Sequence, residues 1–267
     1  MTTRPFVRTG TAPSAPRRRL SRGVVVALAG LLAATGPAAA APPTPDATQT
    51  GAAVRAAGFS TVFRYTFDKG ESLRPGTKVR DVSGNRYTGT VKTAEGGTLS
   101  LERHKSAGRA AGFPCKSCGR AAIEVNRKRG LNPLERAFRF GADIRMRSAH
   151  VSRQSNVLQK GYYNQAGGQY KLQVDGGLPS CVVMGSAGRV TVRSARSVVD
   201  GRWHSLSCQR IGTRVVLRMD GAKLAQGVGP TGVIRNSAPV RIGAKKLAPS
   251  GDQYHGDLDN PYLKIAR

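Results

Sequence analysis

Carboxylate side chains are the first residues in this sequence that could do chemistry. Hydrolysis of a glycosidic bond needs two carboxyl groups, about 5 Å apart in retaining enzymes. Only Asp257 and Asp259 stand at the spacing that places two carboxylates on one face of a strand, and no glutamate follows Glu135. The four histidines lack the spacing of a metal site, and the segment 185–188 lacks the Gly-x-Ser-x-Gly pattern of a hydrolase. The residues therefore indicate a protein without a catalytic set.

Four cysteines could form disulfides, a redox centre or a zinc site. A redox Cys-x-x-Cys needs a helix start in a βαβ setting, and zinc needs a second close pair of ligands. The sequence around Cys115 and Cys118 offers neither, and Cys181 and Cys208 lie far apart. An even number of cysteines in an exported chain favours two disulfides. Of the three pairings, Cys115–Cys118 with Cys181–Cys208 is preferred here.

A tyrosine-rich segment is the first candidate for ligand binding. Residues 161–170 contain Tyr162, Tyr163 and Asn164 among glycines and glutamines. Aromatic rings stack on sugars, and amides hydrogen-bond to their hydroxyl groups. The segment therefore predicts a glycan contact, with an ordinary hairpin loop containing half-buried tyrosines as the alternative.

Basic residues form a second candidate binding surface. The chain carries 43 Lys+Arg against 15 Asp+Glu, a net charge of +28. Residues 101–160 hold 14 of these cations and four acids, and Arg139, Arg145 and Arg147 share one face of a predicted strand. Such a surface attracts acidic polymers. Nucleic acid is not the expected partner, because no aromatic residues are interleaved with the cations.

The N-terminus has the organisation of an export signal. Six arginines and no acid occupy residues 1–22, an apolar stretch covers 23–34, and small residues precede Ala41. This pattern predicts a signal peptide at 1–40 and a secreted, extracellular protein, by the general or the twin-arginine route. A membrane anchor is the alternative, but the apolar run is too short to span and Pro37 interrupts it. Residues 41–58 are rich in Pro, Ala and Thr, which predicts a flexible lead-in.

Alternating hydrophobicity predicts that strands position these residues. Residues 138–147 place five apolar side chains on one face and polar ones on the other, and 213–219 precede an Asp220-Gly221 turn typical of a hairpin. No helical period extends over twelve residues. We predict an all-β antiparallel β-sandwich, or jelly roll, in one domain at 59–267. Its strands are expected at 61–67, 98–101, 121–125, 138–147, 156–159, 169–174, 190–193, 203–211, 213–219, 222–225, 239–242 and 262–265.

Several short motifs occur in an order that resembles a known family. Asp200-Gly201-Arg202-Trp203-His204 is followed by a strand ending in Asp220-Gly221, by Ile242-Gly243, and by Gly256-Asp257-Leu258-Asp259. Near the start, residues 81–85 read Asp-Val-Ser-Gly-Asn. Together these resemble the laminin-G-like branch of the concanavalin A-like lectin/glucanase superfamily over about residues 60–267. The resemblance implies a concanavalin A-like jelly roll.

The same resemblance implies a structural calcium ion. Family members often join the Asp-x-Ser-Gly-Asn loop to the last strand through calcium, which maps here to Asp81 and Asp259 with Asp257 as a neighbour. Carboxylate oxygens are suitable calcium ligands. The alternative is that Asp81 caps a turn and Asp259 pairs with an arginine.

The resemblance also bears on activity. Hydrolytic relatives carry a Glu-x-Asp-x-Glu strand, which is absent here. We therefore expect a secreted, non-catalytic module that recognises an extracellular glycan or cell-wall polymer. A polyanion-binding module and a protein–protein adhesion module are the alternatives, and a glycoside hydrolase is the most remote one.

Overall fold

The computed structural model describes residues 58–69, 72–105, 107–125 and 129–267. The predicted signal peptide and nearly all of the predicted lead-in lie outside this range, as do residues 126–128. Within the described residues, no helix is long and apolar enough to cross a membrane.

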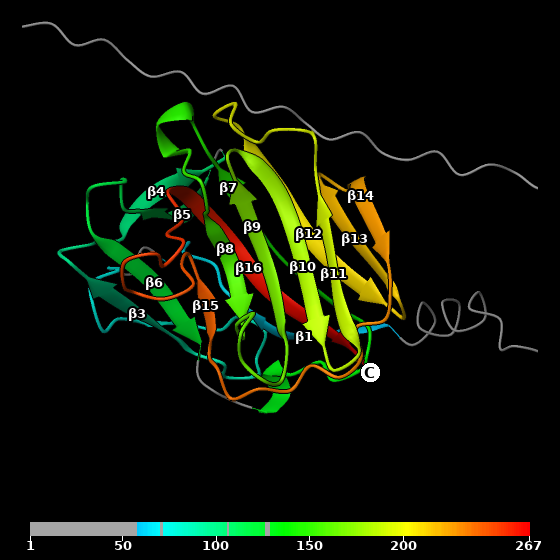
Figure 1. Cartoon of the computed structure of the whole chain (residues 1–267). Helices are drawn as coiled ribbons and strands as arrows, with labels where there is room; N and C mark the ends of the chain where they lie inside the picture. Colours follow the sequence, from blue (N-terminus) through cyan, green and yellow to red (C-terminus); the bar gives the residue numbers. More distant parts are fainter. Residues whose placement is uncertain (1–57, 70–71, 106, 126–128) are drawn as a thin grey trace, which may run out of the picture. The chain divides into compact units, whose positions relative to one another are not determined.

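Two antiparallel sheets form the domain (Figure 1). In sheet A the strand order is β14-β13-β12-β7-β16-β5-β4, and β1 also pairs with β16. These strands are β1 (Phe59–Arg64), β4 (Ser100–His104), β5 (Gly108–Phe113), β7 (Phe138–Arg145), β12 (Trp203–Ile211), β13 (Arg214–Met219), β14 (Ala222–Val228) and β16 (Gly256–Ala266).

Sheet B has the order β11-β10-β9-β8-β15-β6-β3-β2 and lies in front of sheet A in Figure 1. Its strands are β2 (Lys78–Val79), β3 (Gly89–Ala94), β6 (Arg120–Val125), β8 (Asn156–Lys160), β9 (Gln169–Asp175), β10 (Leu178–Gly185), β11 (Gly188–Arg193) and β15 (Val240–Ile242). Two single-turn 3₁₀ helices, Arg129–Leu131 and Ser148–His150, complete the described elements. The all-β, antiparallel sandwich predicted from the sequence is thus confirmed.

The core fills the space between the two sheets. Phe138 and Phe140 of β7 stack with their ring centroids 5.6 Å apart, and the Phe140 ring lies 5.0 Å from that of Tyr170 on β9. All three side chains are buried. Because side chains alternate along a strand, the polar residues between these aromatics face outward. The strands that build the core therefore also determine the two outer surfaces.

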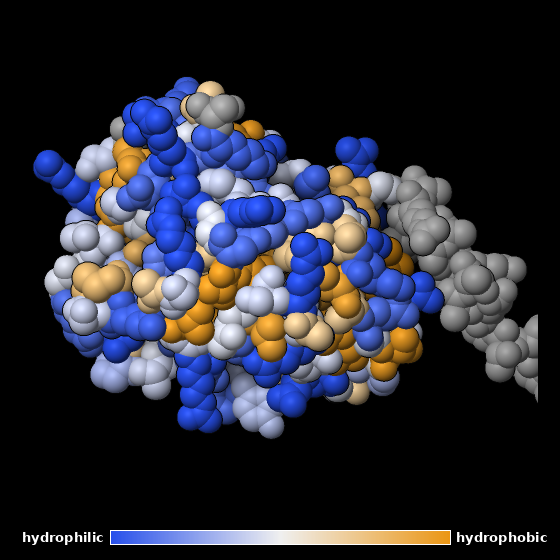
Figure 2. Space-filling model, turned by 90° about the horizontal axis from the view of Figure 1, so that it is seen from above, coloured by the Kyte–Doolittle hydropathy of each residue, from blue (hydrophilic) through white to orange (hydrophobic). Residues whose placement is uncertain are grey.

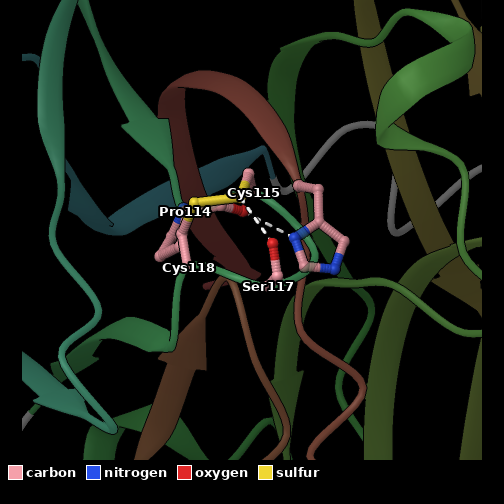
Figure 3. Close-up of a disulfide and its surroundings, with 5 residues drawn as sticks. Pro114, Cys115, Ser117 and Cys118 are labelled. Carbon is pink, nitrogen blue, oxygen red and sulfur yellow. Dashed lines mark hydrogen bonds between the residues drawn. A yellow bond between two sulfur atoms is a disulfide. The ribbon is translucent and has the colours of Figure 1, made fainter.

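Both disulfides predicted from the sequence are present. Cys181 on β10 bonds to Cys208 on β12, with Cα atoms 5.9 Å apart, so this buried bridge joins sheet B to sheet A. Cys115 bonds to Cys118 within an exposed loop, with Cα atoms 4.9 Å apart. Figure 3 shows this second bridge with Pro114 and Ser117 beside it.

Candidate functional site

The outer surface of sheet B carries a row of polar side chains. On β9, Tyr170, Leu172 and Val174 point into the core, so Gln169, Lys171, Gln173 and Asp175 point out. Strand register places matching polar residues from the adjacent strands beside them. We call this set the polar face: Asn156, Gln159, Gln169, Lys171, Gln173, Asp175, Ser180 and Arg241.

Side chains of the polar face are recessed despite facing outward. The exposed fraction is 1% for Asn156, 2% for Ser180, 3% for Gln159 and 9% for Gln173. A surface strand normally leaves its outward polar residues in water. One covering element is the segment before β16, since the carbonyl of Asp252 accepts the amide hydrogen of Asn156 at 2.8 Å.

Four oxygens of this face are buried without a hydrogen-bond partner among the described residues. They are the side-chain oxygens Asn156 Oδ1, Gln173 Oε1, Asp175 Oδ1 and Ser180 Oγ. Asn156 and Ser180 both pair directly with Gln173 across the sheet. An unmatched buried polar group costs about 1–3 kcal/mol, so a cluster of them calls for a physical explanation. All four atoms can accept a hydrogen bond, and no donor for them lies among the described residues.

Two opposite charges of the polar face, Lys171 and Asp175, influence each other. Burial lowers the pKa of Lys171, while Asp252 and Asp175 act in the opposite direction. Burial likewise raises the pKa of Asp175, and Lys171 opposes that shift. Both groups are thus partly removed from water. In such surroundings, hydrogen bonds and charge interactions are stronger than in bulk solvent.

The predicted tyrosine segment forms the loop between β8 and β9, at one end of the polar face. Gly161, Gly167 and Gly168 adopt positive φ angles, and a Cβ atom at Gly161 would meet the Gly168 carbonyl at 2.1 Å, so the loop closes tightly. The Tyr162 hydroxyl accepts a hydrogen bond from Arg241, which fixes this ring to the polar face.

Tyr163 and Asn164 of the same loop remain exposed. Tyr163 is 68% exposed, and the guanidinium of Arg189 lies 5.1 Å from its ring centroid. Such a cation–π contact holds the ring without covering it completely. Of the three predicted ligand residues, Tyr163 and Asn164 are available to a partner, while Tyr162 supports the loop.

The predicted arginines lie on the other sheet. Arg139 donates to Gln209 Oε1 at 2.7 Å, and Arg145 donates to Asp257 Oδ2 at 2.7 Å, with its guanidinium 5.1 Å from the Trp203 ring. Arg147 follows β7 and is exposed. The structure therefore does not bring the arginines together with the tyrosine loop, and two of the three already have partners on neighbouring strands of sheet A.

The three aspartates predicted to hold calcium do not form one site. Asp81 caps its turn: Oδ1 accepts the amides of Arg64 and Ser83, and Oδ2 accepts the Ser83 hydroxyl and the Tyr87 amide. The described residues contain no group of three or more His, Cys, Asp and Glu that could hold a metal. The residues at Asp81 thus do not fit calcium, since hydrogen-bond donors already surround its carboxylate.

Asp257 and Asp259 have partners on sheet A instead. Asp257 pairs with Arg145, while Asp259 Oδ2 lies 2.5 Å from His104 Nδ1 and 2.9 Å from Asn260 Nδ2. Burial raises the pKa of Asp259 to about 6, an effect opposed by the Asn260 amide and by His104. This polar cluster around His104 was not predicted from the sequence, because its members come from separate strands.

Hydrophilic side chains project from much of the surface seen in Figure 2, with hydrophobic groups between them. That surface is consistent with the high net charge of the sequence. The polar face differs from it by being recessed and incompletely hydrogen-bonded. The polar face, with Tyr163 and Asn164 at its end, is accordingly the candidate site.

Comparisons with known proteins support the fold. Residues 156–264 match the family model of the Laminin G domain. Domain 4 of AbnA, a GH43 extracellular arabinanase from Geobacillus stearothermophilus, solved in complex with arabinotriose, is similar with a TM-score of 0.58 and 16% identity, over 78% of this chain and 93% of that one. No curated protein sequence matches the chain.

Two toxin domains are also similar in structure. The binding domain of Paraclostridial Mosquitocidal Protein 1 has a TM-score of 0.56 and 14% identity over 78% of this chain. The binding domain of Botulinum Neurotoxin DC in complex with SialylT has a TM-score of 0.53 and 11% identity over 76% of this chain. The chain spans about half of each of these domains, 49% and 47% respectively. With its two antiparallel sheets and its family match, the chain has the laminin-G-like, concanavalin A-like jelly-roll fold.

Proposed function

We propose that this protein is a secreted, non-catalytic binding module that recognises an extracellular glycan through the polar face of sheet B. The observation that carries the proposal is the cluster of buried oxygens without partners on Asn156, Gln173, Asp175 and Ser180. Each sugar ring offers several hydroxyl groups, and every hydroxyl can donate a hydrogen bond. A glycan is therefore the kind of ligand that would satisfy a row of acceptors.

The exposed Tyr163 ring complements these acceptors. An aromatic side chain provides an apolar surface for the carbon–hydrogen face of a sugar, while polar groups beside it set the orientation. Tyr163 lies in the loop that follows β8, and Asn164 of the same loop adds an exposed amide. The loop and the polar face together would thus contact both the apolar and the hydroxylated surfaces of a saccharide.

Similar structures support a binding role. The arabinanase domain was solved with arabinotriose and the neurotoxin binding domain with SialylT, so this sandwich serves in other proteins as a ligand-binding domain. A non-catalytic role agrees with the single carboxylate pair of β16, since Asp257 is held by Arg145 and Asp259 by His104. The two disulfides are compatible with the predicted export.

Isothermal titration against a panel of neutral plant and bacterial oligosaccharides, arabinotriose included, tests the proposal. We expect wild type to bind at least one member and Gln173→Ala to weaken that binding about tenfold, as expected for about 1.4 kcal/mol. Gln226→Ala removes an exposed amide on β14 of sheet A and is the matched control, expected to bind as wild type does. An absence of binding to all members, or equal losses in both variants, would refute the proposal.

A further inference from the structure

A groove of about 430 Å³ lies next to the exposed Cys115–Cys118 loop. Residues from four separate segments form its walls: Glu95 after β3, the stretch 116–120 at the disulfide loop, the turn at 152–154 and the segment at 250–255. Figure 3 shows the disulfide end, with Pro114 and Ser117 close to the bridge. Asp252 lines the groove, and its charge also acts on Lys171 of the polar face. The groove is therefore adjacent to the proposed glycan site.

The charge of this groove is positive. Lys116, Arg120 and Arg153 line it together with two acids, Glu95 and Asp252. Each acid already has a cation: Glu95 lies 3.0 Å from Arg120, and Asp252 lies 2.9 Å from Lys245. In the part of the chain that the structure describes, Lys116 and Arg153 form no ion pair with a carboxylate. Two cations thus remain to attract an anion.

A histidine adds a directed group to the wall of the groove. The Nδ1 atom of His255 lies 2.6 Å from the carbonyl oxygen of Pro114, which requires a hydrogen on Nδ1. In the neutral ring the other nitrogen, Nε2, is then an acceptor, and in the charged ring it is a donor. His255 lines the groove, so protonation would turn it from a partner of hydroxyl groups into a partner of anions.

We infer that this groove binds a carboxylate or sulfate group of an acidic polysaccharide whose sugar backbone lies along the polar face. This inference rests on the proposed function and specifies its ligand class. Lys116 and Arg153 supply the attraction, and His255 supplies a directed hydrogen bond. A glycan with anionic substituents would satisfy both the acceptors of the polar face and the unpaired cations of the groove.

Anion binding should depend on pH. Burial lowers the pKa of His255, and His150, Lys116 and Arg120 lower it further, while the Pro114 carbonyl raises it. Burial, Arg147, Arg145 and Lys116 lower the pKa of His150, against the effect of Asp257. A bound anion favours the charged form of His255, so binding takes up a proton and becomes tighter as the pH falls below 7.

Titration with paired oligosaccharides tests the inference. The probes are pentagalacturonate with its methyl ester, and a heparin-derived hexasaccharide with its desulfated form, in 150 mM salt at pH 7.5 and 5.5. We expect at least one charged probe to bind at least tenfold more tightly than its neutral counterpart, with the difference larger at pH 5.5. The double variant Lys116→Ala/Arg153→Ala should lose the preference for charged probes. The variant His255→Gln should keep this preference but lose its dependence on pH.

Arg214→Ala/Lys223→Ala is the matched control, because it removes two exposed cations from the β13–β14 hairpin of sheet A. An equal loss in this control, or no preference of wild type for any charged probe, would overturn the inference. The two proposals remain separable. A wild type that binds neutral sugars but does not prefer charged probes refutes the groove alone, whereas insensitivity of all sugar binding to Gln173→Ala refutes the polar face.

Discussion

Asn156 and Gln173 lie directly opposite each other on β8 and β9, and each has a buried side-chain oxygen without a partner among the described residues. The amide nitrogen of Asn156 donates to Gln159 at 2.5 Å, and that of Gln173 donates to Asp175. The donors of this pair are thus used within the chain, and the acceptors are left over. Under the proposed function, a hydroxyl-rich ligand would supply the missing donors.

The two disulfides should differ in their contribution to stability. Cys181–Cys208 closes a loop of 27 residues between the sheets, whereas Cys115–Cys118 closes one of three. The loop-entropy relation gives about 3.5 kcal/mol for the first and about 1.5 kcal/mol for the second. Chemical denaturation of the two double alanine variants measures this difference. Equal losses of unfolding free energy would show that loop closure does not account for the contribution of the bridges.

Arg210 should be intolerant even of lysine. Its buried guanidinium donates to the carbonyls of Leu134 and Arg136, both at 2.7 Å, and to that of Gly232 at 2.9 Å, and burial lowers its pKa to about 10. A lysine ammonium cannot reproduce this fork. We expect Arg210→Lys to reduce the unfolding free energy by about 2–4 kcal/mol.

Arg214→Lys, at an exposed position of β13, is the control for that substitution and should stay within about 0.5 kcal/mol of wild type. Urea denaturation of both variants checks the prediction. A loss in Arg210→Lys no larger than that in Arg214→Lys would mean that the carbonyl contacts of Arg210 do not stabilise the fold.

Asp259 should make stability depend on pH. Its pKa, raised to about 6 by burial, lies above the ordinary value of 3.8, so the folded state holds this proton over a range in which the unfolded state has released it. Its contribution to stability is therefore greatest below pH 4 and declines as the pH rises through 6. Asp259→Asn removes this titration. The free energy of unfolding of Asp259→Asn, relative to that of wild type, should rise from pH 4 to pH 7. A difference between the two proteins that stays constant over this range would contradict the raised pKa of Asp259.

Asp81 should stabilise the fold through hydrogen bonds and not through calcium. Its carboxylate accepts the amides of Arg64, Ser83 and Tyr87. Bonds to a charged acceptor are worth about 1.5–3 kcal/mol each, so Asp81→Ala should cost about 3 kcal/mol or more. The melting temperature of wild type should be the same in 1 mM calcium and in EDTA. A rise of several degrees with calcium would restore the metal prediction.

The sequence predicts most of the fold. Strict alternation identifies β7, and the Asp220-Gly221 turn identifies the β13–β14 hairpin. By contrast, β5 was missed because Gly108–Phe113 is built from small residues without a hydrophobic period. β10 was missed because Leu178–Gly185 contains Pro179 and the run Cys181–Met184 is continuously apolar, without alternation. In these strands, tertiary pairing outweighs local pattern.

The candidate site is less predictable. Aromatic and amide side chains identify the loop of Tyr163 and Asn164. By contrast, Gln173 looks like an ordinary solvent-facing residue of an alternating strand, and Ser180 lies in a strand that the sequence pattern does not identify. Their burial depends on neighbours distant in sequence. The same holds for Arg145, whose partner Asp257 lies 112 residues away on β16. Partners that come from separate strands leave no local signal in the sequence.

Glycan affinity of Ser180→Ala is the most direct test of the polar face. Ser180 is 2% exposed, and its hydroxyl has no partner among the described residues, so removal of the hydroxyl takes no hydrogen bond from the folded chain. Titration with the glycan bound by wild type should give an affinity about 5- to 30-fold weaker, with an unfolding free energy equal to that of wild type or higher. Unchanged affinity in Ser180→Ala would contradict the account.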